Sequence, residues 1–275
     1  MQTFIPYLVV AFIYIAVAAD FWRGNKPNAS ADNKFVFGLH SAILALGLVI
    51  HGWLLYQGIF ATGLGVGFNL GLYHAISAIM WLTVLIYWLA DLEHALHSLQ
   101  AFVLPPAAMC VLLPAFFHSN HLLPADSSAL FMLHIGIALL AYSLFTFAAL
   151  HAALMYFAEA SLHNKKSPLK ALSFPPLMVM ENLLFKVIVI GFVLLTITLL
   201  SGMLFSEKIF NQALQFNHKT IFSIASWLIY GGLLYGRFKF GWRGKKAIRW
   251  TLIGFVLLLL AYVGSKFILQ VLLQK

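Results

Sequence analysis

Eleven histidines are the side chains in this sequence best suited to chemistry, and they outnumber its 8 acidic residues. A neutral imidazole is a common ligand of transition metals. The single cysteine, Cys110, excludes an internal disulfide, a thiolate zinc site and a Cys-x-x-Cys redox pair. The sequence contains no glycine-rich phosphate loop, no nucleophile elbow and no His-Glu-x-x-His motif. We therefore expect the chemistry of this chain to depend on where its histidines lie.

The elements that position these histidines must be embedded in a membrane, because the chain has too few charges to cover a soluble surface. It is 62% hydrophobic and 9% charged, with 17 basic and 8 acidic residues. A soluble domain carries roughly 25% charged residues. This composition excludes a soluble enzyme, a secreted domain and a disordered protein. The net charge of +9 is spread too thinly for a nucleic-acid-binding surface, and we interpret it as a topology signal.

Eight apolar stretches are long enough for membrane-crossing helices, which need about 20 residues each. They cover residues 3–21, 36–57, 70–89, 94–115, 128–158, 184–205, 219–236 and 247–272. Basic residues concentrate in the alternate loops 22–35, 159–183 and 237–246, so the positive-inside rule places both termini outside. The sequence therefore predicts an all-α, polytopic transmembrane helical bundle of about eight spans. We expect it to form a single integral membrane domain over residues 1–275.

This topology sorts the histidines by depth, and several fall towards the outer face. His134 lies near the outer end of the fifth span, and His218 opens the seventh span beside Lys219. His74 and His51 lie towards the outer ends of the third and second spans. Haem fits such an arrangement, because it needs one or two neutral imidazoles and an apolar wall, with its acidic propionates near water or a cation.

His134 and His218 are therefore candidate ligands of haem iron, and Lys219 is a candidate partner for a propionate. His51 and His74 are further candidates for cofactor binding. A simpler interpretation stays open for these histidines. His134 and His51 would then be packed polar groups bonded to a neighbouring helix, and His218 would be a helix-start residue.

Motifs in the second half of the chain are typical of one family of membrane proteins. These motifs are Leu133-His134, Leu139-Leu140-Ala141-Tyr142, Pro175-Pro176-Leu177, Leu199-Leu200-Ser201-Gly202, His218-Lys219-Thr220, Ala225-Ser226-Trp227, Gly241-Trp242-Arg243-Gly244 and Ala261-Tyr262-Val263-Gly264. With them the chain resembles the YpjD- and HemX-like members of the cytochrome c assembly protein family, to which CcsA also belongs. The resemblance is strong over residues 128–270, and weaker but collinear over residues 1–127.

The resemblance implies a role for one of the outer histidines. In the family's haem-handling members, an outer-face histidine opens a helix ahead of a tryptophan-rich segment that ends in Trp-Asp-Pro-Lys-Glu. His134 matches that histidine by its context. Phe216-Asn217-His218-Lys219-Thr220 stands where the tryptophan-rich segment would end, so His218 is an outer histidine that the family motif lacks. A membrane-depth histidine of the family falls near Tyr235. The resemblance thus implies a haem ligand at His134, and the residues themselves add His218.

By this resemblance the chain is a multi-pass protein of the bacterial inner membrane that binds or handles haem and assists cytochrome c-type biogenesis with other maturation proteins. We expect no catalytic turnover and no nucleic-acid partner. One alternative is a HemX-like regulatory or scaffold protein that acts through the basic loops 159–183 and 237–246 without haem as cargo. A small-solute transporter is a weaker alternative, because no carboxylate lies at mid-membrane and no inverted repeat is visible. Gly232 and Gly236 permit a helix dimer without requiring one.

Overall fold

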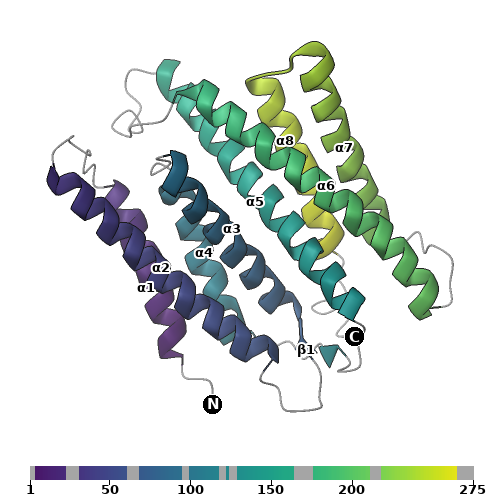
Figure 1. Ribbon diagram of the computed structural model, residues 1–275, viewed down its shortest axis with the longest axis horizontal. Coiled ribbons are helices and arrows are strands. Elements are labelled where there is room, and N and C mark those ends of the chain that lie inside the picture. The colour runs from purple at the N-terminus through teal and green to yellow at the C-terminus, as the bar shows by residue number, and fades with distance from the viewer. Residues whose placement is uncertain are drawn as a thin grey trace. The chain divides into compact units, whose positions relative to one another are not determined.

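The protein is built almost entirely of helices in the parts of the chain that the structure describes (Figure 1). This computed structural model describes residues 4–22, 31–60, 68–94, 99–117, 122–123, 129–163, 176–210 and 218–264. The helices are α1 (Ile5–Trp22), α2 (Ala31–Phe60), α3 (Leu72–His94), α4 (Gln100–Phe116), α5 (Ala129–His163), α6 (Leu177–Phe210), α7 (His218–Phe240) and α8 (Lys245–Leu259), with a π-helical turn, η3 (Leu260–Gly264), after α8. Two short strands, β1 (Phe68–Asn69) and β2 (Leu122–Leu123), pair antiparallel. The predicted all-α class is confirmed.

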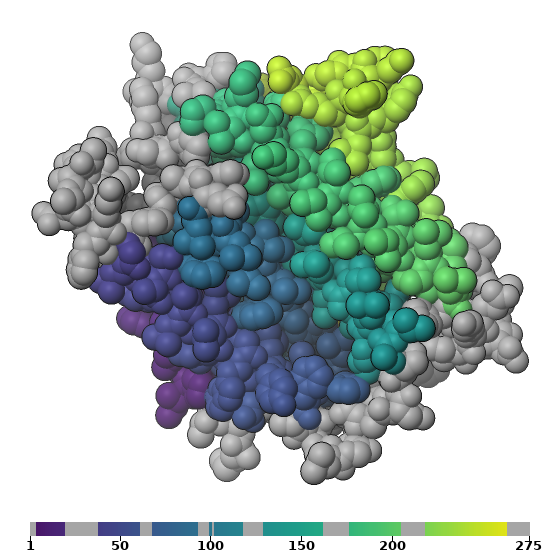
Figure 2. Space-filling model, viewed as in Figure 1, coloured from purple at the N-terminus to yellow at the C-terminus, as the bar shows by residue number. Residues whose placement is uncertain are grey.

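Four of these helices contain a stretch that is long and apolar enough to cross a membrane. The stretches are Gly38–Phe60, Leu72–Leu92, Ala129–Ser161 and Leu177–Leu204. Large apolar side chains also face outward, as lipid-facing residues do: Phe12 is 71% exposed and Val49 is 69% exposed. In Figure 2, α6 lies in green across the visible face, and its exposed apolar residues include Val189, Ile190, Val193 and Leu200. The chain is therefore a membrane protein, while the count of eight spans and the outer placement of both termini stay predictions.

The helices divide into two compact units. The first unit comprises Met1–Asp126 and Phe157–Pro176, and the second comprises Ser127–Tyr156 and Leu177–Lys275. In the first unit, α1 packs against α2 and α4, and α3 also packs against α2 and α4. The strand pair β1–β2 belongs to this unit, with Phe68 opposite Leu123. The single membrane domain expected over residues 1–275 stays a prediction.

In the second unit, α7 packs against α6, α8 and η3. The long helix α5 joins them through stacked rings and a hydrogen bond. Phe145 of α5 stacks on Tyr230 of α7 with ring centroids 4.0 Å apart. His151 of α5 donates from Nε2 to the carbonyl of Met180 in α6, at 2.7 Å. These contacts hold α5, α6 and α7 in register, and they position the site described below.

Helix α6 begins earlier than the sequence predicts. The sixth span is expected to start at residue 184, with residues 159–183 as a loop, whereas α6 starts at Leu177 and α5 continues to His163. Pro176 directly precedes the first helical residue of α6, at the boundary where the helix begins. Glu181 lies in the second turn of α6, where two arginines pair with its carboxylate. The basic residues Lys165, Lys166 and Lys170 of the predicted loop lie outside the described residues.

Candidate functional site

His134 lies early in α5, and its ring is oriented by a serine from α6. His134 Nδ1 is 2.7 Å from Ser201 Oγ. The Ser201 hydroxyl is also 2.7 Å from the carbonyl oxygen of Ile197, to which it donates. A carbonyl can only accept a hydrogen bond, and a hydroxyl has one proton. Ser201 must therefore accept its bond from His134 Nδ1–H, which makes His134 the tautomer with its lone pair on Nε2.

This tautomer is the one that a metal-ligating histidine adopts when a neighbouring group holds its other ring nitrogen. Gly202 packs beside the same ring: a β-carbon added there would lie 3.5 Å from His134 Cε1. Phe131, nearly one turn earlier in α5, is almost parallel to the His134 ring at 17°. The ring of His134 is thus fixed by neighbours from both α5 and α6.

The start of α7 brings a positive charge to the same part of the second unit. Lys219, the second residue of α7, interacts electrostatically with His134. His218 directly precedes it as the first residue of α7, and its side chain is exposed. Three of the five predicted site residues, His134, His218 and Lys219, therefore belong to one unit. Within it, the ammonium group of Lys219 on α7 acts electrostatically on the imidazole of His134 on α5.

The other two predicted site residues belong to the first unit, and both are tightly packed. His51 is completely buried, with Nδ1 3.2 Å from the hydroxyl of Tyr14 and Nε2 3.0 Å from Ser77 Oγ. It joins α1, α2 and α3, and it would have to release one of these bonds to coordinate a metal. His74 is buried against α2, and a β-carbon at Gly58 would lie only 2.6 Å from its Nε2. His51 thus links three helices, and His74 fills the space beside Gly58.

The donor set of the second unit fits haem better than a bare metal ion. Among the residues that the structure describes, no three His, Cys, Asp or Glu side chains converge on one metal position. A structural zinc site needs four such ligands, and a catalytic one needs three. Haem iron needs only one or two protein ligands, and its propionates need a cation. In such a site His134 would supply the imidazole, and Lys219 would supply the cation.

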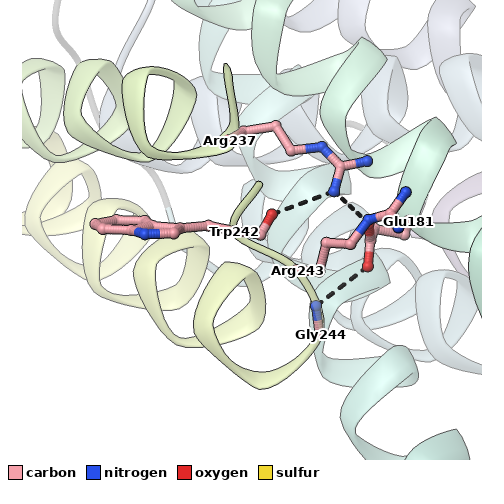
Figure 3. A network of polar contacts seen from close by, with 5 residues as sticks. All are labelled: Glu181, Arg237, Trp242, Arg243 and Gly244. Atoms are coloured by element: carbon pink, nitrogen blue, oxygen red, sulfur yellow. Dashed lines mark hydrogen bonds and ion pairs between the residues drawn. The ribbon is translucent and has the colours of Figure 1, made fainter. Parts of the chain in front are cut away.

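A second polar network lies at the turn between α7 and α8 (Figure 3). Glu181 of α6 accepts from Arg237 Nη1 at 2.7 Å, and its same oxygen lies 3.2 Å from Arg243 Nε. The other oxygen of Glu181 accepts from the backbone N–H of Gly244 at 3.1 Å. Arg237 Nη1 also donates to the carbonyl of Trp242 at 3.2 Å. One carboxylate therefore ties the end of α7 and the start of α8 to α6.

Sequence reasoning did not find the partners in either network. Ser201 and Gly202 stand inside one of the family motifs, which was the available signal, but the bond between Ser201 and His134 joins residues 67 positions apart. The Gly232-x-x-x-Gly236 spacing does mark close helix packing. The partners are two tryptophans of the same chain: a β-carbon at Gly232 would lie 3.1 Å from the Trp250 ring, and Gly236 packs directly against the Trp242 ring.

Comparison with known proteins relates most of the chain to the same family that its motifs indicate. Residues 39–273 match the family described as Cytochrome C assembly protein. The chain is 30% identical over 230 residues to the inner membrane protein YpjD of Escherichia coli strain K12. The aligned region covers 84% of this chain and 85% of the relative. It is 21% identical over 285 residues to the cytochrome c biogenesis protein CcsA of Prochlorococcus marinus strain MIT 9303, covering 92% of this chain and 87% of that protein.

Proposed function

Because the chain belongs to the cytochrome c assembly protein family, we propose that it is an inner membrane protein that binds or handles haem and assists cytochrome c-type biogenesis. Its relatives support this role by their descriptions, one as an inner membrane protein and another as a cytochrome c biogenesis protein. Haem is the cargo in this proposal, and we propose no catalytic turnover. The partners would be the lipid bilayer, haem and other maturation proteins.

The observation that supports haem handling most strongly is the hydrogen bond from His134 Nδ1–H to Ser201 Oγ. It fixes the tautomer that leaves the lone pair on Nε2, the nitrogen that would coordinate iron. Lys219 would pair with a propionate, since its charge already acts at His134. His218 would supply a second ligand from the exposed start of α7. Bound haem would supply the iron centre that a cytochrome c needs, and the protein would hold it until transfer.

His51 and His74 take second rank in this proposal. Each is buried in the first unit, and His51 already uses both ring nitrogens in hydrogen bonds. Haem binding at His51 would cost at least one of these bonds, to Tyr14 or Ser77. At His134 the hydrogen bond between Nδ1 and Ser201 would be retained while Nε2 coordinates.

The proposal is tested by the absorption spectrum of the full-length protein purified from cells supplied with haem. We expect a Soret band in the wild-type protein and its loss in the His134→Ala/His218→Ala double variant. His163→Ala, at the other end of α5, is a matched control that should keep the band. A full Soret band in the double variant would overturn the assignment of these two ligands.

A second candidate function is a HemX-like scaffold that acts through the basic loops without haem. The observation that favours it is the network at Glu181, which ties the basic α7–α8 turn to α6. A scaffold predicts no Soret band and a loss of cytochrome c yield when Lys165, Lys166 and Lys170 are neutralised. A haem-handling protein predicts the band, with these lysines dispensable for it.

A further inference from the structure

Helix α6 carries a lysine on its outward face, inside the stretch Leu177–Leu204 that is apolar enough to cross a membrane. This residue, Lys186, is exposed, and it lies about 13 Å along the helix axis from Leu177. Glu181, which pairs with two arginines, lies about 7 Å nearer that end of the helix. The side chain of Lys186 therefore starts deeper in the apolar stretch than the charged network at Glu181.

The charge of Lys186 is not matched within the part of the chain that the structure describes. No carboxylate there pairs with its ammonium group, and Glu181 on the same helix already pairs with Arg237 and Arg243. A charged side chain that faces lipid is unfavourable, and such residues almost always pair with another polar group. The long side chain of a lysine can also extend to the headgroups. The residues that surround Lys186 distinguish these two cases.

Exposed residues on both sides of Lys186 suit contact with another helix. Asn182, one turn earlier, is exposed, and amide side chains form hydrogen bonds between helices in membranes. The exposed residues that follow are β-branched, so they have few rotamers and lose little entropy when a second helix packs on them. We define the α6 stripe as Asn182, Lys186, Val189, Ile190, Val193 and Ile197, which recur at helical spacing. In Figure 2 the middle of α6, in green, is uncovered on the visible face.

We propose that the α6 stripe binds a transmembrane helix of a second membrane protein, and that an Asp or Glu of that helix pairs with Lys186. Asn182 would donate a hydrogen bond to the same helix, and the valines and isoleucines would pack against it. A second copy of this chain does not fit, because a two-fold contact through this face brings two ammonium groups together. A lipid headgroup would match the charge but leave the β-branched residues without a packing partner. The proposal goes beyond haem handling, because it uses none of the residues near His134.

The test is photo-crosslinking in intact cells of the natural host, with p-benzoylphenylalanine at position 193 of the full-length chain. We expect an adduct with a different membrane protein, identified by mass spectrometry, that has an Asp or Glu within a membrane-spanning segment. Lys186→Glu should reduce this adduct at least about tenfold, because it replaces a charge pair by two like charges. Replacement of the partner's acid by lysine should restore the adduct in the Lys186→Glu background.

Two controls accompany this test. Lys186→Arg keeps the positive charge and should keep the adduct, and restoration by the second charge reversal separates loss of pairing from loss of folding. The crosslinker at position 256, where Val256 of α8 is as exposed as Val193, should not give this adduct. An adduct that is unchanged in the Lys186→Glu variant, or whose partner has no acid in its spans, would overturn the proposal. So would labelling of lipid alone or of a second copy of this chain. None of these readouts depends on a Soret band, so a failure of haem handling is distinguished from a failure of this proposal.

Discussion

Glu181 holds the α7–α8 turn against α6, so its replacement should destabilise the second unit by an amount that its contacts define. Its side chain is 11% exposed, and it receives three donors. The half-buried, charge-assisted bond from Arg237 contributes about 1.5–3 kcal/mol. Arg243 is 57% exposed, and an exposed pair contributes about 0–1 kcal/mol. Loss of the acceptor for Gly244 N–H adds about 1 kcal/mol.

These contributions predict that Glu181→Ala lowers the free energy of unfolding by about 3–5 kcal/mol. Glu181→Gln keeps one acceptor oxygen, so it should lower the free energy by only about 2 kcal/mol. The two arginines should also differ. A double-mutant cycle with Arg237→Gln should give a coupling of about 2 kcal/mol, while a cycle with Arg243→Gln should give less than about 1 kcal/mol.

Reversible unfolding of the purified protein in mixed detergent and SDS micelles, followed by circular dichroism, measures these free energies. Glu207→Gln, near the other end of α6, is the control for removal of a carboxylate from the same helix, and we expect it to have little effect. Equal couplings for the two arginines would refute the reasoning, because it assigns most of the energy to the less exposed pair. So would a Glu181→Ala variant as stable as the wild-type protein.

The remaining predictions concern three other contacts. Ser201→Ala should weaken haem binding about 10–100-fold in a spectroscopic titration, because His134 loses the bond that sets its tautomer; unchanged affinity would contradict the assigned role. Gly58→Ala should destabilise the protein by about 1–3 kcal/mol, because the new methyl group meets the ring of His74. Gly236→Ala should lower the free energy of unfolding at least as much in the same assay, because the Trp242 ring packs on that glycine. Gly136→Ala is the control for both variants, because the space around Gly136 is open.

The helical class was predictable because hydropathy alone determines which stretches can be buried in lipid. The start of α6 was not, since a carboxylate normally marks a span end. Glu181 instead lies within the helix, where its charge is matched by Arg237 and Arg243, residues more than fifty positions later in the chain. Such a long-range pair leaves no periodic signal in the sequence, so the boundary could only be found from the structure.

The candidate site was predictable in its histidines but not in what orients them. Depth along the span and the family motif both indicate His134. Its partner Ser201 comes from a different helix, and the choice of Nδ1 as the donor depends on a second bond from Ser201 to Ile197. For His51 the bonds to Tyr14 and Ser77 likewise depend on how α1, α2 and α3 pack. Spacing along one helix cannot show such contacts between helices.

The most direct test of the central claim, that His134 coordinates haem iron, is chemical rescue of the ligand. The full-length His134→Gly variant is purified, supplied with haem, and its absorption spectrum is recorded with and without added imidazole. If His134 is a ligand, the variant binds haem weakly or with an altered Soret band, and imidazole restores the wild-type spectrum. A variant whose spectrum and haem affinity match the wild-type protein without imidazole would contradict the account.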